Sequence, residues 1–393
     1  MRRIAILLAL MSVTMLLAAG VAFTQVPEED ADPYIVVLKD SVDEPSQVAQ
    51  GIEQRQDVDV GFVYSNALEG FSAEIPDDSV DEVRNNPQVD FVERDKIVHA
   101  AVQILPWGVD RIQADESSTR AGNHKGAVSN VNAYVIDSGI DENHRDLNVV
   151  DEINFSDAPD TDCSGHGTHV AGTLAAKDNT VDVVGVAPGA PLTSVKVLDC
   201  GGSGRVSEVI KAIAWVTKEV KGPDGVAGTD DDKRPAIANM SLSSSATRSL
   251  DRAVKQSARN GVFYSVAAGN QGRNACKRSP ARAGAGKNNG IVTTAAVGEK
   301  GVEPRWSNYG PCVDLWAPGT HILSTWLRGG TKTESGTSVS APHVAGTAAL
   351  YLSHHPGAAP ATVEKKLKAD SKPSRHHKSQ DGRRIKRVYA GGY

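Results

Sequence analysis

Hydrophobic patterning divides the chain into a short block and a long one. In the short block, between residues 34 and 93, β-rich runs alternate with amphipathic segments of helical period. The runs are Tyr34–Leu38, Phe62–Tyr64, Gly70–Ile75 and Asp90–Glu93, and the helical segments are Ser46–Gln54 and Asp78–Asn85. This βαββαβ order predicts a small open-faced α/β sandwich.

The long block begins near Trp107 and alternates apolar runs with longer helical patterns. The predicted strands are Val131–Ile136, Leu192–Leu198, Ala236–Leu242, Val262–Ala267 and Ile291–Val297, and the predicted helices are His166–Ala176, Ser207–Glu219, Ser249–Asn260 and Ser338–His354. Such alternation is typical of a doubly wound, mostly parallel sheet with helices on both faces. Functional side chains of these α/β sheets gather at the carboxyl ends of the strands.

The first 22 residues have the composition of a secretory signal peptide. Met1-Arg2-Arg3 precedes the apolar stretch Ile4–Ala19, and small residues follow. An uncleaved membrane anchor is the alternative, because the apolar stretch approaches spanning length. We predict a signal at 1–22 and a secreted product, extracellular or periplasmic, with no stable membrane association.

Charge is distributed unevenly along the 393 residues. Residues 28–96 contain 19 acidic and 5 basic side chains, whereas residues 97–393 carry a net charge of +6. Opposite charge favours a first block that folds against the second. The basic last twenty residues are interpreted as a solvated final turn, with a functional basic tail as the alternative.

Three segments far apart in the sequence carry residues of nucleophilic catalysis. Asp137 follows a predicted strand, His166 and His169 stand in Gly-His-Gly-Thr-His, and Ser338 opens an Ala-rich helix. A serine hydroxyl needs an imidazole base, and the base needs an acceptor that fixes its tautomer. The residues alone do not decide which histidine is the base. A zinc site on both histidines is the rival, but it lacks the glutamate of a His-Glu-x-x-His motif.

The Asp, His, Ser order and these motifs resemble the subtilisin-like serine proteases, or subtilases. The resemblance implies that Asp137 orients, that His166 is the base and His169 structural, and that Ser338 is the nucleophile. It also implies an oxyanion hole from the Asn270 side chain, within Ala267-Ala268-Gly269-Asn270, and the Ser338 backbone N–H. We therefore expect a serine endopeptidase that hydrolyses proteins and peptides through an acyl-enzyme, without a cofactor for catalysis.

The same resemblance predicts the substrate cleft. Gly202, Ser203 and Gly204 form one edge, Ser241, Leu242 and Ser243 form the other, and Ala267, Ala268 and Gly269 complete the wall. An extended peptide would lie between these edges by β-augmentation. The family usually has two glycines after Ser-Leu, whereas this chain has Ser243-Ser244, which is expected to narrow or polarise the pocket for the residue before the scissile bond.

Four cysteines in a secreted chain indicate two disulfides, with three possible connectivities. Their sequence contexts resemble the aqualysin branch of proteinase K-like enzymes, which implies the pairs Cys163–Cys200 and Cys276–Cys312. The first block resembles the inhibitory propeptide of secreted subtilases. That resemblance predicts a propeptide at 23–100, cleavage before Ala101, and a catalytic domain at 101–393.

Metal sites are predicted less directly. Asp314 matches the calcium carboxylate of proteinase K, and the carbonyls of Gly290 and Val292 are the expected partners. A carboxylate that caps a turn is the alternative. The inserted segment 222–233 is interpreted as a solvated acidic loop, with a second calcium site as the alternative. Expected partners are protein substrates and the chain's own propeptide, acting as chaperone and inhibitor, with no nucleic acid and a monomeric state.

Overall fold

The computed structural model describes residues 31–55, 58–96, 103–226, 229, 232–233, 235–286 and 288–393. The described residues up to Asp95 form one compact unit and those from Lys96 onward form a second, and the two are treated separately below. The predicted signal peptide and the predicted cleavage site before Ala101 lie outside the described residues. Within those residues, no helix is long and apolar enough to cross a membrane.

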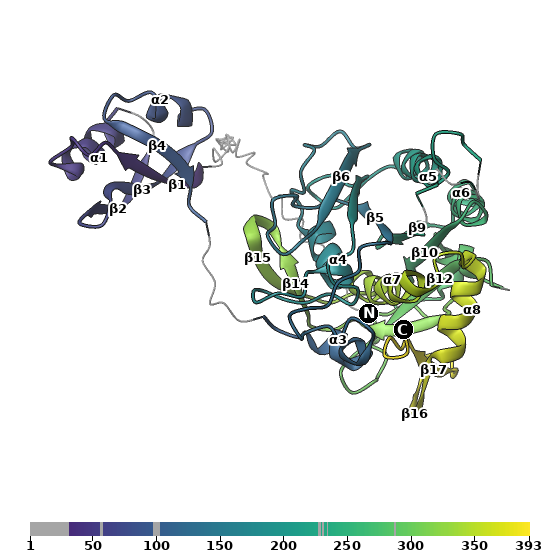
Figure 1. Ribbon diagram of the computed structural model, residues 1–393. Helices are drawn as coiled ribbons and strands as arrows, with labels where there is room; N and C mark the ends of the chain where they lie inside the picture. Colours follow the sequence, from purple (N-terminus) through teal and green to yellow (C-terminus); the bar gives the residue numbers. More distant parts are fainter. Residues whose placement is uncertain are drawn as a thin grey trace, which may run out of the picture. The chain divides into compact units, whose positions relative to one another are not determined.

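The first unit is a four-stranded antiparallel sheet with two helices (Figure 1). In chain order its elements are β1 (Ala31–Leu38), α1 (Pro45–Glu53), β2 (Asp59–Ser65), β3 (Glu69–Pro76), α2 (Val80–Arg84) and β4 (Val89–Arg94). The strand order is β2-β3-β1-β4. Val36, Phe71 and Ile52 pack in its core, whereas Phe62 and Phe91 are 76% and 47% exposed. The predicted α/β sandwich is confirmed.

The second unit contains a nine-stranded sheet in the order β16-β17-β13-β12-β10-β8-β5-β7-β6. Neighbouring strands are parallel, except for the antiparallel hairpin of β16 and β17. The strands are β5 (Asn132–Asp137), β6 (Val149–Asn154), β7 (Leu192–Lys196), β8 (Ala236–Met240), β10 (Val262–Ala267), β12 (Ile291–Val297), β13 (Leu315–Pro318), β16 (Lys372–Lys378) and β17 (Arg384–Arg387). Shorter antiparallel pairs are β9 (Ser244–Ser245) with β11 (Arg278–Ser279), and β14 (Ile322–Trp326) with β15 (Gly330–Glu334).

Helices cover both faces of this sheet, as predicted. The helices are α3 (Trp107–Arg111), α4 (His166–Ala175), α5 (Val206–Val220), α6 (Arg248–Arg259), α7 (Thr337–His354) and α8 (Pro360–Asp370). Apolar side chains of α5 and α6 form one core, and those of α4, α7 and α8 form another. Short 3₁₀ segments lie at Ala114–Glu116, Ala275–Lys277, Ala281–Gly284 and Leu327–Gly329.

The strand order reverses between β5 and β8, which are adjacent in the sheet. From β5 the chain runs to β6 and β7 on one side, and from β8 it runs to β10, β12 and β13 on the other. A crevice at the carboxyl ends of the strands is expected at such a switch point. Asp137 is the last residue of β5 and therefore stands at this crevice.

The carboxyl-terminal segment differs from the sequence expectation. Residues 372–387 form the β16–β17 hairpin, and β17 adds to the sheet beside β13, rather than forming a solvated final turn. Most side chains of β16 are exposed. Backbone pairing at an edge needs no apolar pattern, so hydrophobic periodicity does not detect this hairpin.

Candidate active site

Asp137 and His166 form a pair at the sheet's switch point, in which the Asp137 side chain is fully buried and that of His166 is 30% exposed. His166 is the first residue of α4, and its Nδ1 lies 2.6 Å from Asp137 Oδ1. The Ser138 backbone N–H donates to the same oxygen at 2.8 Å. Burial alone would lower the pKa of His166, but the Asp137 carboxylate outweighs it and raises that pKa. With the Nδ1 proton held by Asp137, Nε2 is the ring nitrogen left to act as a base.

His169 has a different environment, one turn further along α4. Its Nε2 lies 3.0 Å from the Ile322 carbonyl oxygen and 3.1 Å from that of Lys332. Burial lowers the pKa of His169 to about 4, so the ring is neutral and donates to these carbonyls. The ring thereby ties α4 to the β14–β15 hairpin. Among the residues described, no three His, Cys, Asp or Glu side chains are placed to hold a metal ion, so the zinc alternative has no ligand set.

Ser338 is the second residue of α7 and lines the same cleft as His166. Its Oγ forms no hydrogen bond with a described residue, whereas its carbonyl oxygen accepts from Ser241 Oγ at 2.5 Å. Asn239 Nδ2 donates in turn to Ser241 Oγ at 2.8 Å. These buried contacts fix the start of α7 against β8. Catalytic hydrogen bonds are often long before substrate binds, so an unbonded Ser338 Oγ is compatible with a nucleophile.

Asn270 is oriented by Thr337, the residue before Ser338. Asn270 Oδ1 accepts from the Thr337 backbone N–H at 2.9 Å and from Thr337 Oγ1 at 2.8 Å, which leaves Nδ2 to donate elsewhere. A Cβ placed on Gly336 would lie 2.8 Å from Ser338 Oγ and 3.2 Å from Asn270 Nδ2. Glycine at 336 therefore keeps open the space between nucleophile and amide, where a developing oxyanion would need its donors.

Asp162 holds the start of α4, and no sequence motif pointed to it. Its Oδ1 accepts from the backbone N–H groups of Ser164 and Gly165, both at 2.9 Å, and its Oδ2 accepts from the Thr168 N–H at 3.0 Å. A carboxylate at this end also complements the helix dipole. Asp162 thus fixes the turn that presents His166.

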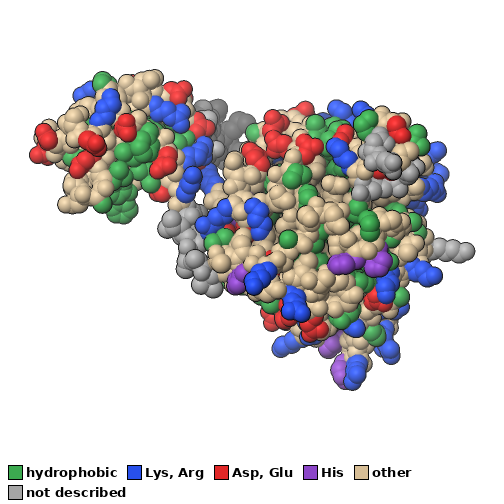
Figure 2. Space-filling model, in the orientation of Figure 1, with side chains coloured by type: hydrophobic (Ala, Val, Ile, Leu, Met, Phe, Trp, Pro, Cys, Tyr) green, Lys and Arg blue, Asp and Glu red, His purple; other side chains and the backbone are tan. Residues whose placement is uncertain are grey.

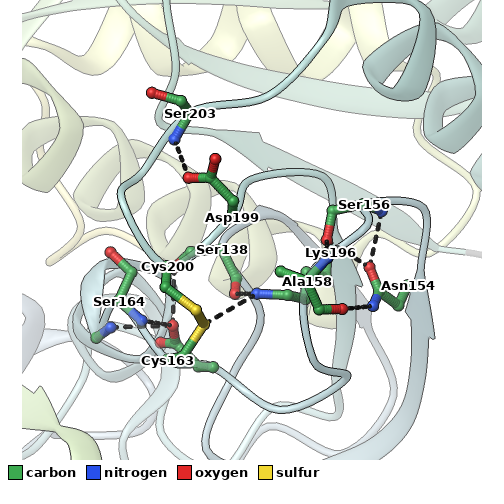
Figure 3. Close-up of a disulfide and its surroundings, with 12 residues drawn as sticks. Ser138, Asn154, Ser156, Ala158, Cys163, Ser164, Lys196, Asp199, Cys200 and Ser203 are labelled. Carbon is green, nitrogen blue, oxygen red and sulfur yellow. Dashed lines mark hydrogen bonds between the residues drawn. A yellow bond between two sulfur atoms is a disulfide. The ribbon is translucent and has the colours of Figure 1, made fainter. Parts of the chain in front are cut away.

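Lys196, another residue missed by motif reasoning, lies opposite Asp137 on the neighbouring strand β7 and is fully buried. Its Nζ donates to the Ser138 carbonyl oxygen at 2.5 Å, beside the Cys163–Cys200 disulfide (Figure 3). Burial lowers the pKa of Lys196, while the Asp162 and Asp137 carboxylates act to raise it. The ammonium therefore places positive charge next to the buried carboxylate of the pair.

Both predicted disulfides are present. Cys163 pairs with Cys200, and Cys276 pairs with Cys312. The first joins the loop before α4 to the loop after β7, which contains Gly202-Ser203-Gly204. It therefore links the turn that carries His166 to one edge of the cleft.

The cleft has a volume of about 500 Å³ and runs past His166, Asn270 and Ser338. Of the predicted substrate residues, it is lined by Gly202, Ser203, Gly204, Ser241, Leu242, Ser243, Ala267 and Gly269. Ala268 does not line it, because its side chain is buried in a separate core cluster. Ser244, expected to narrow or polarise the pocket, also lines the cleft. The sequence did not predict the further lining residues Ser164, Leu198, Val206, Val209, Leu250, Gln271 and Thr337.

The two serines that replace family glycines make hydrogen bonds within the protein. Ser243 Oγ accepts from Arg278 Nε at 3.1 Å. Ser244 Oγ lies 3.0 Å from the Ser245 carbonyl oxygen and 3.3 Å from that of Ser279. Both residues still line the cleft, so its wall carries hydroxyl groups that glycine would not supply.

The residues predicted to bind calcium do not fit that ion. Lys368 Nζ lies 2.9 Å from Asp314 Oδ1 and 2.9 Å from Glu364 Oε1. The carbonyl oxygen of Gly290 accepts from the Tyr264 N–H, and Val292 is a buried residue of β12 paired with β10. An ammonium group therefore supplies the positive charge at Asp314. The prediction of a calcium site at Asp314, Gly290 and Val292 is replaced by a lysine–carboxylate cluster.

A doubly wound sheet with a His–carboxylate pair, a serine and an asparagine beside one cleft is the arrangement expected of a serine hydrolase. The subtilase family model matches residues 129–384, and the peptidase inhibitor I9 model matches residues 33–101. The chain therefore belongs to the subtilase family of serine proteases and carries an I9-type inhibitor propeptide.

Individual relatives agree with this assignment. The chain is 36% identical over 360 residues to an alkaline serine exoprotease A of Vibrio alginolyticus, covering 85% of this chain but only 63% of the relative. It is 36% identical over 373 residues to an extracellular serine proteinase of Thermus sp. (strain Rt41A), covering 87% and 85%. A crystal structure of a cold adapted subtilisin-like serine proteinase matches with a TM-score of 0.61 and 36% identity, covering 74% of this chain and 99% of that one.

Proposed function

We propose that the chain is a secreted zymogen whose second unit is a serine endopeptidase with Asp137, His166 and Ser338 as its catalytic triad. The observation that carries this proposal is the 2.6 Å contact of His166 with Asp137, on a cleft shared with Ser338 and Asn270. The cleft is lined on one side by Gly202, Ser203 and Gly204 and on the other by Ser241, Leu242 and Ser243, which suits an extended segment of protein substrate between two backbone edges.

The proposed reaction proceeds in two halves. His166 Nε2 takes the Ser338 Oγ proton as Oγ attacks the scissile carbonyl carbon, and the oxyanion accepts from Asn270 Nδ2 and the Ser338 N–H. The intermediate collapses as the amine leaves with the proton from His166, which gives an acyl-enzyme. A water molecule, deprotonated by His166, then attacks the acyl carbon, and Ser338 Oγ leaves with the proton. Asp137 remains ionised throughout and stabilises the imidazolium.

Maturation is proposed to use the same site. Residues 23–100, which include the first unit, would form the propeptide and act as chaperone and inhibitor. The enzyme would cut the chain before Ala101. Two features of the described residues support this role. The first unit exposes Phe62 and Phe91 on its sheet, and side chains of this size are suited to bury against a partner surface. Figure 2 shows hydrophobic side chains gathered on one face of this unit. Its acidic charge also complements the basic remainder of the chain.

The test is casein hydrolysis by the wild type and by Ser338→Ala, with Ser353→Ala at the far end of α7 as the matched control. We expect Ser338→Ala to abolish hydrolysis and propeptide removal in a protease-deficient host, while Ser353→Ala retains both. Blocking by a sulfonyl fluoride, with no prompt loss of activity to a zinc chelator, is expected for the wild type. Hydrolysis that survives in Ser338→Ala would refute the assignment.

A further inference from the structure

The β16–β17 hairpin lies at one edge of the large sheet (Figure 1). A second concave site lies beside this hairpin. This site, here the basic pocket, has a volume of about 260 Å³ and shares no lining residue with the catalytic cleft. Its cationic side chains are Arg111 at the end of α3, Lys300 after β12, Lys372 and Arg375 on β16, and Arg387 on β17. Two histidines of β16 also line it.

The basic pocket lacks a carboxylate in its lining; the Asp370 carboxylate, outside that lining, interacts electrostatically with Lys372. No acidic side chain lines it, and none of its five Lys and Arg side chains forms an ion pair within the described part of the chain. The hairpin adds to the excess, because residues 372–387 contain seven Lys or Arg and one Asp. Figure 2 shows Lys, Arg and His side chains at this end of the larger unit. Like charges held this close repel one another unless an anion joins them.

A neighbouring pocket contains acidic side chains. It is lined by Arg111 and Arg387 together with Asp110, Asp115 and Glu116. None of these carboxylates forms an ion pair with either guanidinium in the part of the chain that the structure describes. Arg111 and Arg387 therefore line both pockets, one with carboxylates that form no ion pair with them and one without carboxylates.

Arg387 shows the imbalance most directly. Its Nε is buried and has no hydrogen-bond partner among the described residues. Burial, and then the nearby charge of Arg111, lower the pKa of the Arg387 guanidinium. A buried donor without an acceptor is rare in folded proteins, because its desolvation is not repaid. The planar guanidinium fork matches the oxygens of a tetrahedral oxyanion, to which it can donate two parallel hydrogen bonds.

We propose that the basic pocket binds a multivalent oxyanion of the phosphate class, with Arg387 and Arg111 as its principal donors. Lys300, Lys372 and Arg375 supply further positive charge around it. Lys372 Nζ also lies over the Tyr389 ring, at 3.6 Å from the centroid, which holds this ammonium at the pocket. Bound anion would link β17, α3 and the loop after β12, and would stabilise the hairpin by mass action. This inference does not depend on the proposed peptidase activity.

The test is calorimetric titration of inorganic phosphate into the purified protein, treated with a sulfonyl fluoride against self-digestion and held at constant ionic strength with chloride. Three variants are compared with the wild type: Arg387→Gln, Arg111→Gln and Lys386→Gln. Lys386 is the matched control, because it is an exposed neighbour of Arg387 on β17 that does not line the pocket. Thermal unfolding without phosphate checks that each variant is folded.

We expect one phosphate per chain, a dissociation constant at least about tenfold weaker in Arg387→Gln and in Arg111→Gln, and a change within about twofold in Lys386→Gln. Phosphoserine competing more strongly than phosphate would identify a phosphorylated ligand, and equal or weaker competition a free anion. Absence of saturable binding to the wild type would overturn the proposal. So would an equal loss in Lys386→Gln, because that result means diffuse attraction to the hairpin.

Discussion

Replacing Lys368 by methionine is expected to destabilise the second unit strongly. The ammonium bridges two carboxylates, Asp314 and Glu364, at 2.9 Å each. The side chains of Glu364, Asp314 and Lys368 are 0%, 9% and 25% exposed. Methionine preserves the length and packing of the stem but leaves both carboxylates without their cation. A buried ion pair that loses one partner typically costs about 3–5 kcal/mol, since the remaining charge stays desolvated.

The magnitude should fall at the lower end of that range. Lys368 is partly exposed, and both acids keep backbone donors: the Thr293 N–H on Asp314 at 3.0 Å, and the Gly290 N–H on Glu364 at 2.8 Å. We therefore expect a loss of about 3 kcal/mol at pH 8, or roughly 6–12 °C in the unfolding midpoint.

The effect should depend on pH. Burial raises the pKa of Asp314 from 3.8 to about 6, even though Lys368 acts to lower it. Because the folded pKa lies above the unfolded one, the stabilisation from protonating Asp314 is fully present below about pH 4 and is lost as the pH rises through about 6. Near pH 5 the acid is largely protonated in the native state, so removal of Lys368 should cost less there than at pH 8.

The assay is thermal unfolding of the inhibitor-blocked protein at both pH values, with calcium and with a chelator. Lys366→Met is the matched control, because this lysine of the same helix pairs with Asp370 and is 46% exposed. It should change stability by less than about 0.5 kcal/mol. Equal mild effects of the two substitutions would refute the reasoning. A similar loss of stability in the wild type when a chelator is added would also refute it, since calcium, and not Lys368, would then neutralise the two carboxylates.

Two further predictions concern the catalytic groups. In the wild type, kcat/KM should rise with pH through the raised pKa of His166, because the neutral ring is the base. Asp137→Asn should move the midpoint of this pH–rate profile to lower pH and reduce kcat/KM by at least about 100-fold. An unchanged midpoint in the pH–rate profile would contradict the role of the carboxylate. Thr337→Val, which removes the hydroxyl that orients Asn270, should lower kcat by about tenfold with little change in KM, as measured by steady-state peptide hydrolysis. A loss confined to KM would instead indicate a role in substrate binding.

Most buried strands were predictable from sequence because their apolar runs determine where they pack. The buried strand β13 was not predicted, because its four residues are too short a run to be recognised. The predicted bounds of Val262–Ala267 and Ile291–Val297 agree with β10 and β12, which are buried along their whole length. Edge elements were not predictable in this way. β6 and β16 carry mostly exposed or half-buried side chains, so neither shows the continuous apolar run of a central strand.

The candidate site follows the same division. Asp137, His166, Asn270 and Ser338 stand in recognisable segments. The structure brings His166, Asn270 and Ser338 to one cleft, and Asp137 contacts the Nδ1 atom of His166. Supporting residues depend on partners that sequence distance conceals. Lys368 meets Asp314 across 54 residues, and no local pattern indicates that contact. Asp162 had one usable signal, an acid just before a helix start, which is typical of a capping residue.

The central claim is that Ser338 carries the acyl group, and the most direct measurement is to trap that intermediate. A peptide ester would be mixed with the mature enzyme, the reaction quenched in acid, and the modified residue located by mass spectrometry. The account predicts one acyl group per chain, on Ser338, and none in Ser338→Ala. An acyl group on another residue, or ester turnover with no covalent adduct, would contradict it.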